Sequence, residues 1–360
     1  MKIGKSLFLL LTVSITTATS QAENIHFANN SVKALCIANW DTNNDQELST
    51  EEAAAVTTLG TVFRDFSTTT TFHELRYFTG LTSIGERAFY NSSITGITFP
   101  EGVVEIGLYA FCKSKIAGEL IIPSTVKRVR AYAFLECAAL TRVILEEGVE
   151  EIGSEAFNGP IHFFSLPTTI STYGWDGVNP YMSHGFEDRD YEFHLFARST
   201  TPLAVNTYAF HCLYGEGILV VPWGCIDAYK TTSPWNVFGT ILEIGDVDEN
   251  ETLDDSDLAA IESYIAGGSP SPFNADLADI NGDSQVDETD VQLLRNHLHP
   301  ILLGDTNGDG VVNVQDQINL ITYLLGRTTE VFIQEAADVN GDGVLNTQDA
   351  IGIIEIMLSE

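Results

Sequence analysis

The chain has 360 residues, 44% of them hydrophobic, which is enough apolar material for globular folding but too long a chain for one small core. Its 50 acidic and 17 basic side chains give a net charge of −33. Nucleic acids and anionic membrane surfaces are bound by Lys and Arg, so this charge excludes both as ligands. Residues 245–360 hold 24 of the acidic side chains against only Arg295 and Arg327, so the acidity belongs to one part of the chain.

The first 22 residues have the pattern of a secretory signal peptide. Lys2 and Lys5 precede an apolar run over residues 7–15, and Ser20 and Ala22 put small residues at the −3 and −1 positions of a cleavage site. The run is too short for a transmembrane anchor, which needs about 20 apolar residues. We therefore expect a secreted or cell-surface protein that does not insert into the membrane.

Residues 25–78 are predicted to form a helical cap that carries one loop of the EF-hand type. An apolar helical pattern precedes the loop, an Ala-rich helix follows it, and position 6, where the turn favours Gly, is Gln46. Calcium takes six to eight oxygen ligands, and the loop offers them at positions 1, 3, 5, 7, 9 and 12, namely Asp41, Asn43, Asp45, Glu47, Ser49 and Glu52. The alternative is a metal-free helical cap that only covers the open end of the repeats that follow.

A repeat with a period of 22 to 23 residues runs through the middle of the chain. It is clearest in four Ala-Phe dipeptides, Ala88-Phe89, Ala110-Phe111, Ala133-Phe134 and Ala156-Phe157. An alternating apolar strand pattern precedes each apolar turn, and two degenerate coils follow, the second marked by Ala209-Phe210. Stacked coils would place strand beside strand and Phe on Phe, so the period predicts a β-rich solenoid over residues 79–244.

One outward stripe of the solenoid is the predicted partner-binding surface. Strand side chains alternate, so the residues between the inward positions point outward, and these are Thr98, Ile121, Ile144 and Ser165. Exposed Ile121 and Ile144 would form an apolar patch of the kind that binds a partner. The alternative is that another segment of the same chain covers this face.

The repeats resemble the BspA-type leucine-rich repeats of bacterial surface proteins. The resemblance rests on the pattern I-G-x-x-A-F after a strand ending in Pro, and on V-V-P-W-G-C-I-D-A-Y-K-T-T-S-P-W over residues 220–235. Arg130 replaces the repeat Gly and Glu146 replaces the repeat Pro, and neither breaks the apolar register. The resemblance implies an elongated solenoid for adhesion or protein binding, and no chemistry.

The acidic third of the chain contains four runs with the spacing of twelve-residue calcium loops. Each places oxygen ligands at positions 1, 3, 5, 9 and 12, with a backbone carbonyl at position 7. The first module holds Asp246, Asp248, Asn250, Thr252, Asp254 and Asp257, then Asp279, Asn281, Asp283, Gln285, Asp287 and Asp290. The second module holds Asp305, Asn307, Asp309, Val311, Asn313 and Asp316, then Asp338, Asn340, Asp342, Val344, Asn346 and Asp349. The pattern predicts four bound Ca²⁺ ions.

Two further loop positions complete the prediction for these modules. Position 6 is Gly310 and Gly343 in the last two loops but Glu251 and Ser284 in the first two, which we expect to bind calcium less tightly. Position 8 is apolar in every loop, so facing loops are expected to bridge their backbones there and to cover a small core.

With Asp at position 12 and Gly-Asp openings, the loops resemble those of type I dockerin modules, one over residues 245–299 and one over 304–360. The resemblance implies calcium-dependent docking to a cohesin-like domain through positions 10 and 11 and the helix beyond. Those pairs here are Asp255-Ser256, Glu288-Thr289, Val314-Gln315 and Thr347-Gln348, so the duplicated Ser-Thr type is not kept. The partner is thus a protein, either a cohesin-like domain or a host or surface protein.

No catalytic constellation is present in the sequence: the histidines are scattered, and neither H-E-x-x-H nor G-x-S-x-G occurs. Five cysteines without a C-x-x-C pair are predicted to be mostly buried free thiols. Trp175, Tyr181 and Phe186 offer either core packing or an aromatic platform for glycans.

The sequence therefore predicts a multidomain, non-catalytic, calcium-binding scaffold or adhesin. Its fold is a leucine-rich repeat solenoid with an N-terminal helical EF-hand-like cap and two C-terminal α-helical, dockerin-like calcium modules. The alternative function is that of an accessory carbohydrate-binding component in a cellulosome-like, polysaccharide-degrading system.

Overall fold

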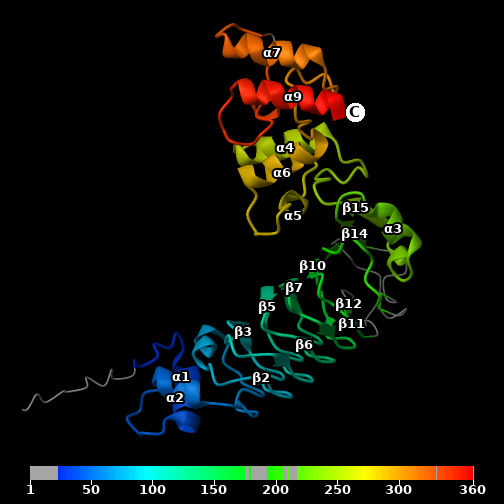
Figure 1. The fold of residues 1–360 in the computed structure, drawn as a ribbon. Helices are drawn as coiled ribbons and strands as arrows, with labels where there is room; N and C mark the ends of the chain where they lie inside the picture. Colours follow the sequence, from blue (N-terminus) through cyan, green and yellow to red (C-terminus); the bar gives the residue numbers. More distant parts are fainter. Residues whose placement is uncertain are drawn as a thin grey trace, which may run out of the picture. The chain divides into compact units, whose positions relative to one another are not determined.

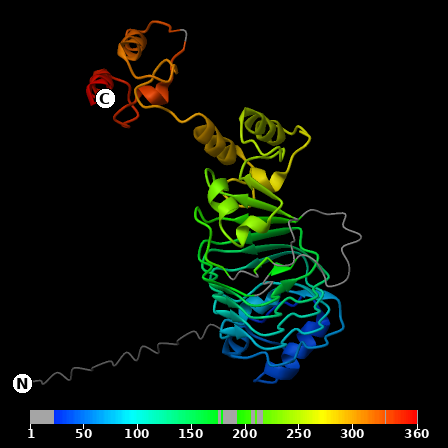
Figure 2. The same ribbon diagram turned by 90° about the vertical axis from the view of Figure 1, so that its right-hand side faces the viewer.

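The computed structural model describes residues 23–174, 178–179, 193–205, 209–210, 217–329 and 331–359. They fall into two compact units, Met1–Ile241 and Leu242–Glu360 (Figures 1 and 2). The first unit is a β-solenoid with a helical segment at its N-terminal end, and the second is built of short helices. The predicted fold class is confirmed, whereas the predicted signal peptide lies outside the described residues.

Two sheets run along the solenoid, because successive coils add strands to each of them (Figure 2). The longer strands pair in the order β15-β14-β13-β10-β7-β5. They are β5 (Ala117–Ile122), β7 (Ala139–Leu145), β10 (Phe163–Leu166), β13 (His194–Ala197), β14 (Ile218–Val221) and β15 (Thr240–Glu243). The pairs from β5 to β14 are parallel and place Ile121 beside Ile144 and Ile144 beside Ser165.

The second sheet consists of two-residue strands in the order β11-β8-β6-β4-β2. They are β2 (Ser83–Ile84), β4 (Glu105–Ile106), β6 (Arg128–Val129), β8 (Glu151–Ile152) and β11 (Thr172–Tyr173). Two smaller parallel pairs complete the coils: β1 (Thr70–Phe72) with β3 (Ile94–Ile97), and β9 (Phe157–Asn158) with β12 (Val178–Asn179).

A column of phenyl rings fills the core of the solenoid. Its buried rings lie with neighbouring centroids between 4.8 and 5.2 Å apart and nearly parallel planes, and they belong to Phe63, Phe89, Phe111, Phe134 and Phe157. Four of them are the Phe of the Ala-Phe dipeptides, so the predicted stacking is confirmed. Phe63 follows Val62 rather than Ala, and the column therefore begins one ring earlier than the dipeptides indicate.

The turn around each Ala-Phe pair joins neighbouring coils through the backbone. The Phe amide donates to the carbonyl of the Ala in the next coil, at 2.7 Å for Phe89 and at 2.8 Å for Phe111 and Phe134. In the four described coils from Ala88 to Ala156, the residue before the Ala has a positive φ, namely Arg87, Tyr109, Tyr132 and Glu155. This conformation costs about 1–2 kcal/mol for a residue with a side chain, and the recurring hydrogen bonds between coils offset it.

The helical segment at the N-terminal end shares one apolar core with the repeats. Helices α1 (Asn30–Trp40) and α2 (Thr50–Ala55) flank the acidic loop, and the 3₁₀ helix η1 (His73–Tyr77) follows β1. Trp40 packs edge-on against Phe78 with ring centroids 5.3 Å apart, and Phe63 continues this packing into the phenyl column. Buried Val32, Cys36 and Leu48 belong to the same cluster.

The far end of the solenoid is closed by aromatic side chains. Helix α3 (Ile226–Thr231) and the 3₁₀ helix η2 (Trp235–Val237) come between β14 and β15. Trp235 is fully buried, packs on Phe210 at 4.9 Å between ring centroids, and donates its indole N–H to the Leu203 carbonyl at 2.9 Å.

The second unit contains two helical modules of the same design. In the first, α4 (Asp255–Ile265) packs against α6 (Glu288–Leu298), with the short α5 (Ala275–Ala278) between them in the chain. In the second, α7 (Val314–Leu324) packs against α9 (Thr347–Ser359), with the short α8 (Gln334–Ala337) between them in the chain. An acidic loop precedes each of the four longer helices, as predicted.

Candidate functional site

The same hydrogen-bond pattern forms in all four acidic loops. The position 1 carboxylate accepts the backbone amide of position 5 at 3.0–3.2 Å, and also that of position 6. The position 12 carboxylate accepts the position 9 amide with one oxygen, at 2.9–3.0 Å, and an amide from the start of the loop with the other. Four fully buried residues occupy position 12, namely Asp257, Asp290, Asp316 and Asp349. These hydrogen bonds alone thus close each loop onto the first turn of its helix.

The first loop brings three carboxylates together. Oxygen atoms of Asp246, Asp248 and Asp257 all lie within 4.8 Å of one another, at positions 1, 3 and 12. Burial, reinforced by the charges of Asp257 and Asp248, raises the pKa of Asp246 to about 6. Burial also raises the pKa of Asp257, and that of Asp279 at position 1 of the second loop. Carboxylates that crowd in this way repel one another, and a divalent cation would relieve the repulsion.

Position 6 has a left-handed backbone in every loop. Its φ is 67° at Glu251, 70° at Ser284, 84° at Gly310 and 75° at Gly343. Gly adopts this conformation freely, whereas Glu251 and Ser284 adopt it at a cost. The turn expected of Gly is therefore kept in the first module despite the substitutions.

The apolar residues at position 8 do not form the backbone bridge that the sequence predicts. Among the described residues, each module is tied instead at its first loop: Gly245 donates to Leu277 and Asn274 to Val247, while Gly304 donates to Ala336 and Ile333 to Thr306. The helix pair places α5 and α8 beside the loop starts, so these segments meet the loop backbones. Position 8 still covers the core, because Val312 is buried and Leu345 packs against the same cluster.

The residues that the dockerin resemblance assigns to recognition are accessible. All eight residues at positions 10 and 11 are exposed at the N-terminal ends of α4, α6, α7 and α9. In the first module two of these helices are joined by the ion pair of Arg295 with Glu262 and by the hydrogen bond between His299 and Asp255, each at 2.6 Å.

The N-terminal loop shares part of the hydrogen-bond pattern of the four C-terminal loops, but its position 1 carboxylate accepts the amides of positions 4 and 6 instead of 5 and 6. Asp41 at position 1 accepts the amides of Asn44 and Gln46, at 2.7 and 3.0 Å. Glu52 at position 12 accepts hydrogen bonds from Thr42 and Ser49, which lower its pKa to about 2 although partial burial opposes this. In the described residues the carboxylates of Asp41, Asp45 and Glu52 do not converge as those of Asp246, Asp248 and Asp257 do.

Two other predicted ligands of this loop have structural partners. The Glu47 side chain pairs with Lys33 at 2.6 Å, which leaves its backbone carbonyl for position 7. Ser49 caps α2 and forms a capping box with Glu52. Residues 23–25 take the place that the backbone of a second, facing loop would have beside position 8. The backbone amide of Ile25 donates to the carbonyl of Leu48, the position 8 residue, at 2.8 Å.

The predicted outward stripe of the solenoid is only partly exposed. Ile121 is 45% exposed and Ile144 is half-buried. Thr98 is exposed but lies beyond β3, which pairs with β1 rather than with β5. Ser165 is 1% exposed and accepts a hydrogen bond from Arg198 at 3.0 Å, so its predicted place on an exposed stripe is wrong. Both faces of β10 and β14 are buried, whereas β5 keeps an exposed face.

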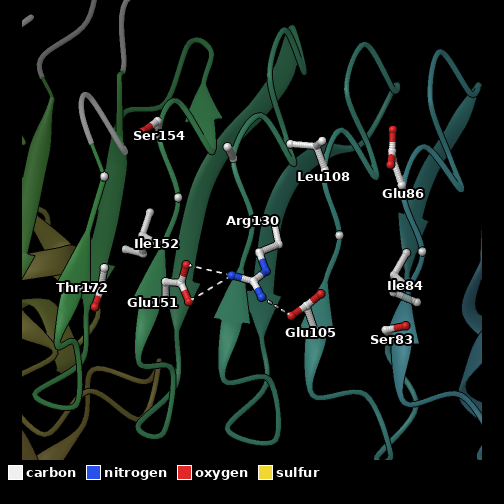
Figure 3. Close-up of a pocket in the computed structure, with 15 residues that line it drawn as sticks. Ser83, Ile84, Glu86, Glu105, Leu108, Arg130, Glu151, Ile152, Ser154 and Thr172 are labelled. Carbon is white, nitrogen blue, oxygen red and sulfur yellow. Dashed lines mark hydrogen bonds and ion pairs between the residues drawn. The ribbon is translucent and has the colours of Figure 1, made fainter.

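The sheet of short strands carries an open groove of about 670 Å³ that the sequence did not predict. Figure 3 shows Arg130 at its centre, between Glu105 and Glu151, with guanidinium-to-carboxylate distances of 2.9 and 3.0 Å. Hydrogen bonds from Arg128 and Arg130 lower the pKa of Glu105 although partial burial opposes this. Arg130 stands at the position where the other repeats have Gly. Its ion pairs with Glu105 and Glu151 explain why this position accepts an arginine.

The cysteines offer no reactive thiol in the described residues. Cys36, Cys112, Cys137 and Cys225 are free and buried, as predicted, and Cys212 lies outside the described residues. Burial raises the pKa of Cys112 to about 11 and that of Cys137 to about 12. The possible glycan platform of Trp175, Tyr181 and Phe186 also lies outside the described residues.

Comparison with known protein families finds matches in two parts of the chain. Residues 63–175 match the BspA type leucine rich repeat region, in six copies. Residues 244–299 and 303–358 each match the dockerin type I domain. Both are interaction domains rather than catalytic ones, and dockerin type I domains bind calcium and cohesin partner proteins.

Two further comparisons add less. A leucine rich cell surface protein from Faecalibacterium prausnitzii A2-165 is similar at 14% identity and a TM-score of 0.25, over 48% of this chain and 62% of that one. No curated protein matches. Among the described residues, no helix has the length and apolar character needed to cross a membrane.

Proposed function

We propose that this chain, a BspA-type leucine-rich repeat protein with two dockerin type I domains, is an exported, non-catalytic scaffold or adhesin. The solenoid binds a protein ligand, and the dockerin domains dock the protein to a cohesin-like partner in a calcium-dependent manner. The observation that carries the proposal is the convergence of Asp246, Asp248 and Asp257, together with the identical closure of the other three loops.

Four Ca²⁺ ions are assigned to the C-terminal loops, held by side chains at positions 1, 3, 5, 9 and 12 and the backbone carbonyl at position 7. In each loop the position 1 carboxylate is held by a hydrogen bond from the position 5 amide, and in the first loop three carboxylates converge within 4.8 Å. Bound calcium supplies the positive charge that these carboxylates lack. Four ions would offset eight of the 22 net negative charges of residues 245–360. Metal binding in such a segment contributes directly to folding.

A fifth Ca²⁺ ion is assigned to the N-terminal loop. The support is that Asp41 accepts the position 6 amide, and Glu52 accepts the amides of position 9 and of the loop start, as positions 1 and 12 do in the dockerin loops. The backbone pairing of Leu48 with Ile25 fixes the loop from the other side.

Protein binding by the solenoid is assigned to the exposed part of the β5–β7 face. Ile121 is the large apolar side chain that this face exposes most, and Ile144 lies beside it in register. Exposed Ile121 and half-buried Ile144, flanked by the Arg142–Glu119 ion pair at 2.9 Å, fit a protein surface with an apolar centre and a polar rim.

The proposal is tested by calcium titration of the chain in a calorimeter, after removal of metal with a chelator. We expect five ions per chain. The double variant Asp246→Asn/Asp257→Asn should lose one ion and keep the others, whereas Asp227→Asn, an acidic residue of α3 outside every loop, should lose none. Absence of calcium uptake by the unsubstituted chain would contradict the proposal.

A further inference from the structure

Three of the C-terminal loops contain the dipeptide Asn-Gly at positions 3 and 4. They are the second, third and fourth loops, with Asn281-Gly282, Asn307-Gly308 and Asn340-Gly341. The first loop has Asp248-Glu249 at the same positions, and the N-terminal loop has Asn43-Asn44. In these three loops, therefore, the side chain assigned to calcium at position 3 is followed by a residue without a side chain.

An asparagine that precedes glycine is chemically labile. The backbone nitrogen of the Gly attacks the side-chain carbon Cγ of the Asn and closes a cyclic imide. The bond between this nitrogen and Cγ forms, the Cγ–Nδ2 bond breaks, and the proton of the Gly amide leaves with the Asn nitrogen as ammonia. Water then opens the ring at either carbonyl and gives aspartate or isoaspartate. Glycine favours the attack because it has no Cβ to shield its nitrogen.

The closed loops hold both reacting groups away from this path. In the third loop, Oδ1 of Asn307 accepts the amide of Asp309 at 2.8 Å, and its Nδ2 donates to the Asp309 carboxylate at 3.0 Å. The amide of Gly308 donates to the Asp305 carboxylate at 2.8 Å. Asn281 and Asn340 make the same two side-chain hydrogen bonds, at 2.8–3.1 Å. The attack requires the Asn side chain to leave these partners, so we expect it only in a loop that has opened.

The opening of these loops depends on metal. Their hydrogen bonds lie near the surface, since Asn281 and Asn340 are exposed and Asn307 is half-buried, and bonds of this kind open locally at a small cost in free energy. An ion that binds only the closed loop lowers the open population in proportion to its own concentration over its dissociation constant. Opening, and with it the reaction, is therefore most frequent without calcium.

We propose that Asn281, Asn307 and Asn340 are sites of spontaneous deamidation that bound calcium suppresses. The inference rests on the proposed function, because it takes position 3 as a calcium ligand. Isoaspartate adds a methylene group to the backbone between positions 3 and 4, which displaces the later ligands relative to position 1. A chain that has lacked calcium for long enough should lose these sites permanently and keep the first loop, whose position 3 is Asp248.

The solenoid supplies a comparison within the same chain, the dipeptide Asn158-Gly159. Asn158 is 5% exposed and lies in β9, where its carbonyl accepts the amide of Glu136 at 2.8 Å. The core of the solenoid holds this segment closed without any acidic loop. Asn158 should therefore stay unmodified both with and without calcium.

Peptide mapping by mass spectrometry tests the inference on the full chain, incubated at mildly alkaline pH with calcium or with a chelator. A synthetic peptide with the sequence of residues 338–344 gives the rate of a fully open loop. In chelator the three Asn residues should be converted, and Asn158 should not. With calcium at 100 times its dissociation constant, the conversion should be about 100-fold slower.

Gly341→Asn is the matched variant. It puts Asn at position 4 as in the N-terminal loop, where Asn44 has a φ of 61° against 70° at Gly341. A Cβ at Gly341 would meet nothing within 4 Å, so the loop has room for the side chain. The variant should protect Asn340, while Asn281 and Asn307 of the same chain still react. Calcium titration after incubation in chelator should then show one more ion retained than in the unsubstituted chain.

Equal rates with calcium and with chelator would overturn the inference. Intact Asn281, Asn307 and Asn340 in chelator, after the peptide has been fully converted, would overturn it too, as would equal conversion of Asn158. Calcium uptake by the fresh chain tests the proposed function separately. Uptake combined with calcium-independent conversion defeats this inference alone, whereas absence of uptake defeats both.

Discussion

The residue at position 6 of each acidic loop determines how much strain the left-handed turn of that loop carries. Glu251 and Ser284 hold the left-handed conformation that Gly310 and Gly343 hold without strain. The side chains of Glu251 and Ser284 are exposed, so Gly at either position removes no packing. The difference between the two dockerin domains at this position is therefore conformational.

We expect Glu251→Gly and Ser284→Gly each to stabilise the first domain by about 1 kcal/mol and to tighten calcium binding there. Gly310→Ser in the second domain should have the opposite effect. Denaturant unfolding and calcium titration would measure both changes. An equal or weaker calcium affinity in the Gly variants would show that position 6 strain does not limit these sites.

Asp246 gives the first loop a pH dependence in the physiological range. Its pKa is raised to about 6, chiefly by burial, so the metal-free folded loop holds a proton more tightly than the unfolded chain does. Without calcium, the free energy of unfolding should therefore fall as pH rises from about 4 to 6. With calcium the proton competes with the ion, so calcium affinity should fall as pH drops through 6.

Calcium titration at pH 5.5 and 7.5 would check this competition, because the first loop should weaken more than the third. The pKa of Asp279 is raised as well, so the second loop should weaken in the same direction. Equal affinity of the first loop at both pH values would contradict the assignment of Asp246 as a ligand.

At the scale of the element, the phenyl column makes each coil depend on its neighbours. Phe111 and Phe134 are almost fully buried and stack on both sides, so removal of either ring leaves a cavity that adjoining coils cannot fill. We expect Phe134→Ala to reduce the free energy of unfolding of the solenoid by about 3–5 kcal/mol. Val104→Ala, at a side chain 38% exposed, should change it by less than about 1 kcal/mol.

Neighbouring residues of β5 provide a second test at this scale, because Ile121 is 45% exposed and Ile122 is fully buried. Ile121→Asp should change the free energy of unfolding by less than about 1 kcal/mol, whereas Ile122→Asp should unfold the solenoid. Urea denaturation distinguishes the two. Unfolding by Ile121→Asp would show that the face is covered by the chain itself and not left for a ligand.

At the scale of the molecule, the two units have separate cores and separate needs for metal. The C-terminal unit contains four acidic loops, and the first of them brings three carboxylates together, whereas the solenoid is held by its phenyl column and by hydrogen bonds between coils. A ligand that binds only the folded state adds about 2.7 kcal/mol per site at 100 times its dissociation constant. Calcium should therefore raise the melting transition of the C-terminal unit far more than that of the solenoid.

Differential scanning calorimetry with calcium and with chelator would resolve the two transitions. Asp257→Asn/Asp290→Asn, which removes position 12 from both loops of the first domain, should reproduce part of the chelator effect in the C-terminal transition. A chelator that leaves this transition unmoved would show that the acidic loops fold without metal.

Much of this protein is determined by the sequence alone, because its elements are periodic and local. The Ala-Phe period forces the coils to stack, and the acidic loops close through hydrogen bonds between residues at most ten apart, from Val247 to Asp257 for example. Such features depend on neighbours that the sequence itself places.

The tertiary structure decided what depends on contacts between distant segments. It buries Ser165 under Arg198, extends the phenyl column to Phe63, and seats Arg130 between two glutamates of neighbouring coils. It also shows that Arg295 pairs with Glu262 between α6 and α4 of the first dockerin domain, while Val314, Ile318 and Ile321 on α7 of the second lie exposed. The helical period places these residues on a helix, but only the packing of one helix against another determines which of them water reaches.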